Sequence, residues 1–459
     1  MGTCGMRENF SDDEDHTKKK TDIAPRNPGK KKKSRKQKEK LEDKFFDDGP
    51  RDSLMPTYQK GAEIVCRFRP ANANEDGAEQ CVQYGDVDAD QKREDDWEVV
   101  DDNQRWDKLT KEQTICEVHT PKSMVSGKTH DFEFDRLFPP QCRNINLYHV
   151  LRNQWFPSLM GGMSVGVIPY GVSGSGKSHT VHGTKADPGI VPLFCKDLFH
   201  RLKKSYGDQG FTNTIRVQFL EIYNDKIVDL LQEREETGKI KPTTPLEPQR
   251  GLTVRSKDLM FSSAPVPAAI DLEVQDEKEL SDAFRKGYLR LRREKVTEGK
   301  VNRISSRSHS VFICSIKRVH EPSGTTTNSL FFAVDLAGPF KGSELTGVKN
   351  QCALNLLNQS LVAFRKVMLF SDTKSTGRHK PYRDSKVTRI IRSLLERGKT
   401  TILLNVSGAT QSARKTIETL RFGLKASQLA KKDIAQNVTL HSLFSEHDPE
   451  YFYSGTLEP

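Results

Sequence analysis

Short apolar runs alternate with longer stretches of helical periodicity along most of the chain. The short runs are rich in β-branched and aromatic residues and end at turn-forming residues, which predicts strands. They lie at residues 63–68, 130–138, 163–170, 214–224, 309–319, 329–338 and 400–407. Longer patterns predict helices at residues 147–159, 226–231, 350–369, 386–395 and 416–430. Strands that alternate with helices predict an α/β fold with helices on both faces of the sheet.

Both ends of the chain depart from this pattern. Residues 1–58 contain few large apolar side chains, and an acidic cluster precedes a basic run at 30–40, so we expect a disordered, charged extension. The basic run is either a solvated tail or a nuclear-localisation or polyanion-binding segment. Residues 431–459 show no sustained heptads, which predicts a short tail, a monomeric chain and a linker strand at 436–440. The folded domain is expected at 59–430, with a proline-containing loop at 233–250.

Composition narrows the class of partner and the compartment. The chain has 459 residues, 29% of them charged, and a formal net charge of +11. This excess favours a polyanionic partner: nucleic acid, an anionic membrane or the acidic surface of another protein. The eight cysteines lack metal-ligand spacing and no secretory signal is recognisable, so we expect reduced thiols in an intracellular protein. No apolar run reaches the roughly 18–20 residues of a transmembrane helix.

One glycine-rich segment fits the phosphate-binding pattern G-x4-G-K-S/T between a predicted strand and a predicted helix. It consists of Gly171, Val172, Ser173, Gly174, Ser175, Gly176, Lys177 and Ser178. The glycines let backbone N–H groups surround phosphate oxygens, and the following helix adds the positive end of its dipole. Lys177 is expected to reach the β- and γ-phosphates and Ser178 to ligate Mg²⁺. The segment predicts a nucleoside triphosphate site without naming the reaction.

Further segments narrow the class of protein. The sequence VDLAG at 334–338 ends a predicted strand, with Asp335 placed to hold Mg²⁺ through water as a Walker-B aspartate does. Other segments are CRFRP (66–70), FLEIYNDKIVDLL (219–231), VNRISSRSHS (301–310), LLNQSL (356–361), HKPYRDSKVTRII (379–391) and TLRFGLKA (419–426). Each is weak by itself. Together, in this order over about residues 62–430, they resemble the motor domain of the kinesin superfamily.

The resemblance implies a P-loop NTPase fold with a central, mostly parallel sheet, and a site for ATP and Mg²⁺. The residues expected to flank the adenine are Arg67, Arg69, Pro70 and His179. The first switch would contain Asn302, Ser305, Ser306 and Arg307, and the second switch Asp335 and Gly338. Ser178, Ser306 and Asp335 would surround the metal. The residues expected to serve hydrolysis are Lys177, Asn302, Ser306, Arg307, Asp335 and Gly338.

The resemblance also implies a partner, the microtubule. A helix that starts near Asn350 lies on the microtubule in kinesins, and a basic segment would face the acidic surface of tubulin. The segment contains His379, Lys380, Arg383, Lys386 and Arg389. The expected protein is an ATP-dependent microtubule motor of the cytoplasm and cytoskeleton, with no membrane span and with a cargo or adaptor at its N-terminal extension. The ordered motifs disfavour a P-loop NTPase that acts on nucleic acid.

The second switch departs from the family pattern D-L-A-G-S-E. Pro339 and Phe340 stand where the family has Ser and Glu. The usual Glu orients the attacking water and pairs with the arginine that is Arg307 here, and Phe340 can do neither. Glu344 follows in a Gly-Ser-Glu sequence and is a candidate replacement if the loop holds an insertion. The alternative function is therefore a nucleotide-binding microtubule-associated protein with weak or no ATPase activity.

Overall fold

A computed structural model describes the fold for a defined part of the chain. The chain divides into two units, residues 1–51 and 52–459, and only residues of the second are described. The described residues are 61–71, 75, 80–84, 107, 110, 115–119, 129–204, 210–223, 225–232, 266, 268–296, 308–339, 348–370 and 380–445. The expectations for residues 1–58 and for the loop at 233–250 therefore lie outside the described residues. No helix within these ranges is long and apolar enough to cross a membrane.

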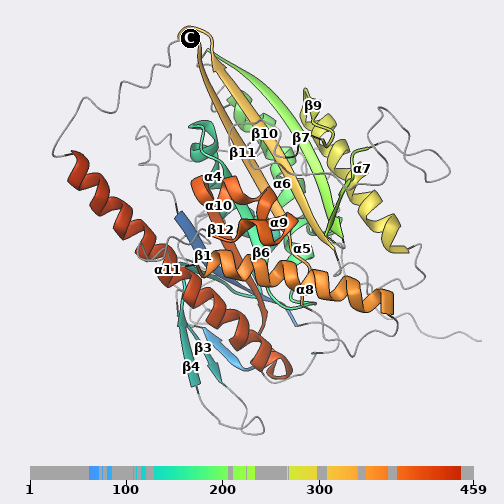
Figure 1. The fold of residues 1–459 in the computed structure, drawn as a ribbon, viewed down its shortest axis with the longest axis vertical. Helices are drawn as coiled ribbons and strands as arrows, with labels where there is room; N and C mark the ends of the chain where they lie inside the picture. The colour runs from blue at the N-terminus through green and yellow to red at the C-terminus, as the bar shows by residue number, and fades with distance from the viewer. Residues whose placement is uncertain are drawn as a thin grey trace, which may run out of the picture. The chain divides into compact units, whose positions relative to one another are not determined.

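A large mixed sheet forms the centre of the second unit (Figure 1). Its parallel part pairs β5 (Arg136–Phe138), β1 (Gly61–Arg69), β12 (Lys399–Ser407), β6 (Val165–Tyr170) and β11 (Thr325–Asp335) in that order. The antiparallel part adds β10 (His309–His320), β7 (Phe211–Tyr223), β8 (Lys226–Asp229) and β9 (Leu272–Val274). The expected α/β sheet is confirmed, but parallel pairing covers only about half of it.

Helices cover both faces of the sheet, as the alternation of helices and strands predicts. One face packs on α4 (Asn144–Met160), α6 (Ile190–Lys204) and α7 (Glu277–Val296). The other packs on α8 (Val348–Met368), α9 (Lys386–Ile390), α10 (Arg392–Arg397) and α11 (Ala413–Ser445). In β10, Phe312 and Cys314 join the first core, whereas Val311 and Ile313 join the second. The period of two in a strand thus divides the apolar side chains between the two layers.

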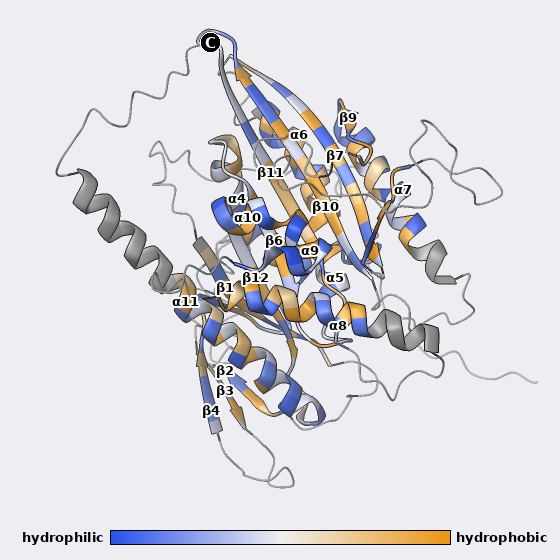
Figure 2. Cartoon of the chain, viewed as in Figure 1, coloured by the Kyte–Doolittle hydropathy of each residue, from blue (hydrophilic) through white to orange (hydrophobic). Residues whose placement is uncertain are grey.

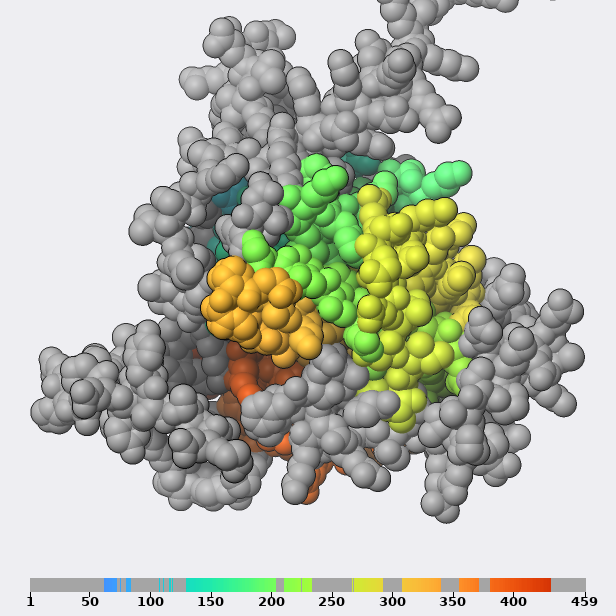
Figure 3. All heavy atoms as spheres, turned by 90° about the horizontal axis from the view of Figure 1, so that it is seen from above, coloured from blue at the N-terminus to red at the C-terminus, as the bar shows by residue number. Residues whose placement is uncertain are grey.

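Hydropathy follows these layers. Figure 2 shows many hydrophobic positions along the central strands, and both hydrophilic and hydrophobic positions along the coloured parts of α8 and α11. Helix α7 lies alongside α6 and β7, and the view from above shows its yellow atoms beside the green atoms of the preceding segments (Figure 3). Sequence analysis found neither α6 nor α7. Helix α7 is charged over much of its length, but Leu280, Ala283, Phe284, Tyr288 and Leu291 recur at helical spacing, so the sequence does carry the pattern of an amphipathic helix.

The single strand expected at 130–138 divides into two. Strand β4 (Thr129–Glu133) joins a small antiparallel sheet with β2 (Val82–Tyr84) and β3 (Ile115–His119), while β5 joins the large sheet. Asp135 lies between β4 and β5, and its hydrogen bonds hold the chain in place where one strand ends and the next begins. Its carboxylate accepts a hydrogen bond from the Ile64 N–H at 2.7 Å, and its own N–H donates to the Ile64 carbonyl at 3.1 Å. These bonds hold the chain against β1 at the change of direction.

Three other sequence predictions are corrected by the structure. Residues 226–229 form strand β8 rather than a helix, because a tight turn with Asp225 at φ 54° pairs them with the end of β7. The helix expected at 386–395 breaks at Ile391 into α9 and α10. Residues 436–440 belong to helix α11 and are not a linker strand.

Candidate nucleotide site

The phosphate-binding segment connects β6 to the short helix α5 (Lys177–Val181), as predicted. Gly174 and Gly176 adopt φ values of 78° and 97°, which side chains rarely tolerate. The Ser175 N–H donates to the Val172 carbonyl at 3.2 Å and closes the turn. The loop therefore needs glycine for backbone reasons alone at Gly176, a fixed position of the pattern, and at Gly174, one of its variable positions. Ser173, Gly174 and Ser178 are exposed, so this side of the loop faces solvent.

Lys177 lies beneath the loop with only 6% of its surface exposed. Its Nζ donates to the Gly171 carbonyl at 3.0 Å and to the Val172 carbonyl at 2.8 Å. Burial lowers the pKa of Lys177 to about 8, and the charge of Asp335 opposes that effect. The ammonium group is thus held by backbone carbonyls of the loop itself.

Asp335, at the end of β11, meets the loop through Ser178. The Ser178 hydroxyl donates to Asp335 Oδ2 at 2.6 Å, and His182 Nε2 lies 3.5 Å from the same oxygen. Burial acts to raise the pKa of Asp335, but the hydrogen bonds from His182 and Ser178 and the charge of Lys177 bring it below its ordinary value. The carboxylate is therefore ionised at neutral pH. This contact links two motifs that are 157 residues apart in the sequence.

These two residues fit a Mg²⁺ ion that also takes oxygen ligands from phosphate and water. Ser178 is an exposed residue, and Asp335 Oδ1 is buried without a hydrogen-bond partner. Magnesium keeps several waters and binds through few protein ligands in nucleotide sites. Within the described ranges, no group of three or more His, Cys, Asp or Glu side chains could hold a metal.

Gly338 contacts the phosphate loop directly. A Cβ atom placed on Gly338 would lie 2.5 Å from the Ser173 backbone nitrogen, a distance that no side chain can adopt. Only glycine fits this approach between the segment after β11 and the loop. Pro339 follows and is exposed. The other switch residues named from the sequence lie outside the described residues; they are Asn302, Ser305, Ser306, Arg307, Phe340 and Glu344.

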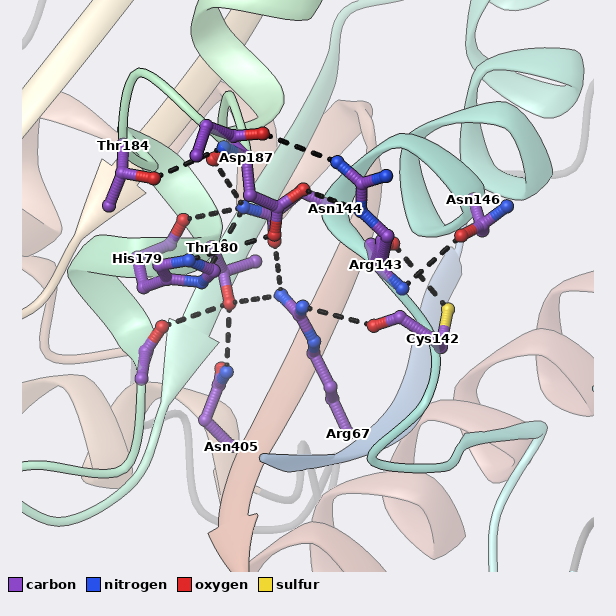
Figure 4. Close-up of polar contacts among 12 residues, drawn as sticks. Arg67, Cys142, Arg143, Asn144, Asn146, His179, Thr180, Thr184, Asp187 and Asn405 are labelled. Carbon is purple, nitrogen blue, oxygen red and sulfur yellow. Dashed lines mark hydrogen bonds and ion pairs between the residues drawn. The ribbon is translucent and has the colours of Figure 1, made fainter. Parts of the chain in front are cut away.

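On the base side of the site, Arg67 lies in the protein interior and is 4% exposed (Figure 4). Its guanidinium donates to Asn144 Oδ1 at 2.6 Å, to Thr180 Oγ1 at 2.8 Å and to the Cys142 carbonyl at 3.3 Å. Asn405 Nδ2 donates to the same Thr180 oxygen at 3.0 Å. Arg67 therefore joins β1 to α4 and α5. Its donors are engaged by protein groups rather than turned towards a base.

Arg69, Pro70 and His179 lie nearer the solvent. Arg69 forms a bidentate ion pair with Glu75, in which both N–O distances are 2.6 Å. Its Nη1 also donates to the Pro70 carbonyl. The His179 side chain is 42% exposed, and its Nε2 lies 3.6 Å from Asp187 Oδ2. Burial and the charge of Arg67 lower the pKa of His179, although Asp187 opposes them. Arg69 is half-buried, and Pro70 and His179 are exposed, so none of the three lies in the core.

Sequence analysis did not identify the polar residues that hold this side together: Asn144, Thr180 and Asn405. Asn144 begins α4, and its Nδ2 donates to the His179 carbonyl at 2.9 Å. Asn405 carried a usable signal, because it is a polar residue within the apolar run of β12. A buried amide in such a run requires a partner, which here is Thr180. The sequence alone does not show that Thr180 is the partner of Asn405.

The basic segment expected to face tubulin lies next to α8. It contains a 3-10 turn (Tyr382–Asp384) and α9, whose start is capped by the Ser385 hydroxyl. Tyr382 is buried, whereas Arg383 is exposed. Lys366 of α8 forms an ion pair with Asp384 at 3.7 Å, which holds the two elements together. Lys380, Lys386 and Arg389 are half-buried, and His379 lies outside the described residues.

A parallel strand, a phosphate loop with a buried lysine, and an aspartate that meets the loop serine define a P-loop nucleotide-binding protein. The kinesin motor domain profile matches residues 67–429. This match covers most of the chain, so the chain belongs to the kinesin motor domain family.

Curated relatives and solved structures agree with this assignment. The kinesin heavy chain of Botryotinia fuckeliana is 30% identical over 380 residues, which cover 81% of this chain and 37% of that protein. Kinesin-related protein 3 of Dictyostelium discoideum is 28% identical, over 80% of this chain and 27% of that protein. The chain spans roughly a third of the length of such relatives.

The motor domain of the Kar3-like kinesin from Ashbya gossypii is 20% identical. The two structures match over 80% of this chain and 100% of that motor domain, with a TM-score of 0.59. Because the identity is low, this match supports the fold only. The structure titled as a fast kinesin is 26% identical, with a TM-score of 0.60 over 81% of this chain and 92% of its own.

Proposed function

We propose that this chain is the motor domain of an ATP-dependent, microtubule-based kinesin. The contact between Ser178 and Asp335 at 2.6 Å carries the proposal, because it brings the phosphate loop and the Walker-B aspartate together. The family match supports binding of a nucleotide at this site. The basic segment beside α8 supports binding of an acidic filament at the neighbouring surface. Tubulin has such an acidic surface.

The residues around the loop have distinct roles in this proposal. Lys177 leaves the Gly171 and Val172 carbonyls to contact the β- and γ-phosphates, while the loop N–H groups surround the phosphate oxygens. Ser178 and Asp335 hold Mg²⁺, which when bound neutralises charge on the phosphates. Gly338 lies against Ser173 and is positioned to respond to the γ-phosphate. Arg69, Pro70 and His179 hold the base.

The rate of hydrolysis depends on the segment after Gly338. Pro339 has no N–H group and a fixed φ, so it removes one donor from the side of the γ-phosphate. Asn302, Ser306 and Arg307 complete hydrolysis in the family pattern, and Phe340 supplies no carboxylate for Arg307. These substitutions favour a slow enzyme, and a microtubule-binding protein with weak or no ATPase activity is the second candidate.

Steady-state ATPase activity with and without microtubules tests the proposal. A motor should show a rate that microtubules increase several-fold, and Lys177→Ala should remove it. If Pro339 and Phe340 limit the rate, the double substitution Pro339→Ser and Phe340→Glu should raise it. Undetectable turnover together with nucleotide-dependent binding to microtubules would instead support the second candidate. Absence of any microtubule binding at low salt would reject both.

The basic segment can be tested separately by co-sedimentation. Neutralising Lys380, Arg383 and Lys386 together should weaken binding to microtubules and reduce its dependence on salt, because exposed charges attract through a screened field. Matched neutralisation of Lys196, Lys203 and Lys317, three lysines that are exposed elsewhere, should have little effect. Cargo binding by the N-terminal extension, a cytoskeletal location and a monomeric state belong to the same proposal. Light scattering at low micromolar concentration would test the last.

A further inference from the structure

His309, the first residue of β10, lies between the segment after β11 and helix α8. It is 2% exposed. Its Nδ1 accepts a hydrogen bond from the Ala337 N–H at 3.1 Å, and its Nε2 lies 2.7 Å from Ser360 Oγ. The Ser360 hydroxyl in turn donates to the Leu357 carbonyl of the same helix at 2.7 Å. Four buried residues thus form one continuous chain of hydrogen bonds.

The direction of each bond in this chain is fixed by chemistry. A backbone N–H can only donate, so Nδ1 of His309 must be the unprotonated nitrogen. The single hydrogen of the Ser360 hydroxyl is used on the Leu357 carbonyl, so its oxygen must accept from His309 Nε2–H. The ring is therefore neutral, with its proton on Nε2. Burial lowers the pKa of His309 to about 4, which agrees with a neutral ring.

One end of the chain of hydrogen bonds adjoins the phosphate loop, and the other end lies inside helix α8. Ala337 lies between Asp335, which contacts Ser178, and Gly338, which contacts the backbone of Ser173. Ser360 lies on the buried side of α8, among apolar residues of the core. The opposite side of the same helix exposes Gln359, Val362 and Lys366. A shift of the segment 335–338 would therefore change a hydrogen bond that ends inside α8.

We propose that His309 and Ser360 are positioning residues that couple the nucleotide site to helix α8 through this chain of hydrogen bonds. The inference rests on the proposed function for its physiological meaning, but the coupling itself is a property of the free protein. The apolar contacts of α8 tolerate small sliding, whereas a directed hydrogen bond to a ring nitrogen does not. A displacement of Ala337 therefore changes the position of α8 more through this chain of hydrogen bonds than through the surrounding apolar contacts.

Ser360→Ala is the decisive variant, because it removes the α8 end of the chain and leaves every residue at the nucleotide site unchanged. Ser158→Ala is the matched control. Ser158 is also a buried helical serine, and it donates to a carbonyl of its own helix, that of Gln154, at 3.1 Å. Ser360→Thr retains the hydroxyl. All three variants should keep their nucleotide affinity within about twofold, and melting curves establish that each is folded.

Hydrogen exchange of the α8 amides at 355–368 is measured in the ADP state and with a non-hydrolysable ATP analogue. The parent, Ser158→Ala and Ser360→Thr should show a difference between the two states, and Ser360→Ala should lose most of it. With microtubules, the ratio of the dissociation constants in the two states should be about 5 or more in the parent, the lower end of typical allosteric coupling. It should fall below about 2 in Ser360→Ala.

The two measurements separate failure of the coupling from failure of the proposed function. If the parent does not bind microtubules, the motor assignment fails, and exchange in α8 still decides the coupling. If Ser360→Ala keeps the parent's difference in exchange, or if the parent shows no difference between the two states, the coupling is rejected. A loss of the difference in Ser158→Ala would also reject it, since any buried serine would then have the same effect.

Discussion

The phosphate side and the base side of the nucleotide site are built in different ways. On the phosphate side, eight consecutive residues form the loop, and its geometry follows from glycines and from Lys177 itself. On the base side, the contacts come from β1, α4, α5 and β12, and they converge on Arg67 and Thr180 (Figure 4). The phosphate loop can therefore keep its geometry when the sequence changes elsewhere in the chain. The contacts on the base side depend on how all four of these elements pack together.

The largest effect is expected for Lys177→Ala. It removes the side-chain cation that the structure places beneath the loop. Charge-assisted hydrogen bonds contribute about 1.5–3 kcal/mol each, so the affinity for ATP should fall about 100-fold or more while the fold is retained. Calorimetric titration measures this, with Lys196→Ala on the exposed surface of α6 as the control. Unchanged affinity would mean that the loop does not bind phosphate.

Arg67→Met should affect stability more than nucleotide affinity. The substitution keeps an apolar side chain of similar length but removes the guanidinium donor from Asn144 Oδ1 and from the Cys142 carbonyl, whereas Thr180 Oγ1 keeps the hydrogen bond from Asn405. Unsatisfied buried groups cost about 1–3 kcal/mol each, so the free energy of unfolding should fall by about 2–4 kcal/mol. Chemical denaturation measures the loss. Arg143→Met, at a side chain that is 62% exposed, should change stability by no more than about 0.5 kcal/mol.

Nucleotide affinity should depend on pH through Lys177. Its pKa is about 8 in the free protein, because burial disfavours the charge. Bound phosphates stabilise the ammonium and raise that pKa, so binding takes up a proton once the pH exceeds about 8. Affinity for ADP should therefore be nearly constant below pH 7 and fall about tenfold from pH 7 to pH 9. The same titration of Lys177→Arg should lack this fall, since arginine stays charged.

The smallest effect is expected for His179→Ala. The side chain is 42% exposed and contributes little to the core, so stability should change by no more than about 0.5 kcal/mol. Loss of a ring that stacks on the base should weaken ATP binding by roughly fivefold, at the low end of measured stacking contributions. Fluorescence titration with a labelled nucleotide measures it. A loss of stability without loss of affinity would assign His179 to the interior network instead.

Residues close together in the sequence were predicted well, and residues joined only by the fold were not. The loop, the strand before it and the position of Asp335 at a strand end follow from local patterns. The buried position of Arg67 does not, because its partners lie 75 to 113 residues away. The same reason explains why sequence analysis missed Asn144 and Asn405. Polar residues in apolar runs indicate that a partner exists, but they do not say which residue it is.

By itself, the sequence determined the family, the phosphate loop, the order of the main strands and the departure from the family pattern at Pro339. Backbone conformation and alternation of apolar positions are local properties, so they can be read without coordinates. Tertiary structure alone decided the mixed pairing of the sheet, the interior position of Arg67, and the contact of His309 with Ala337 and Ser360. Each of these depends on which distant segments pack together, and a buried polar group takes its role from the partners that packing supplies.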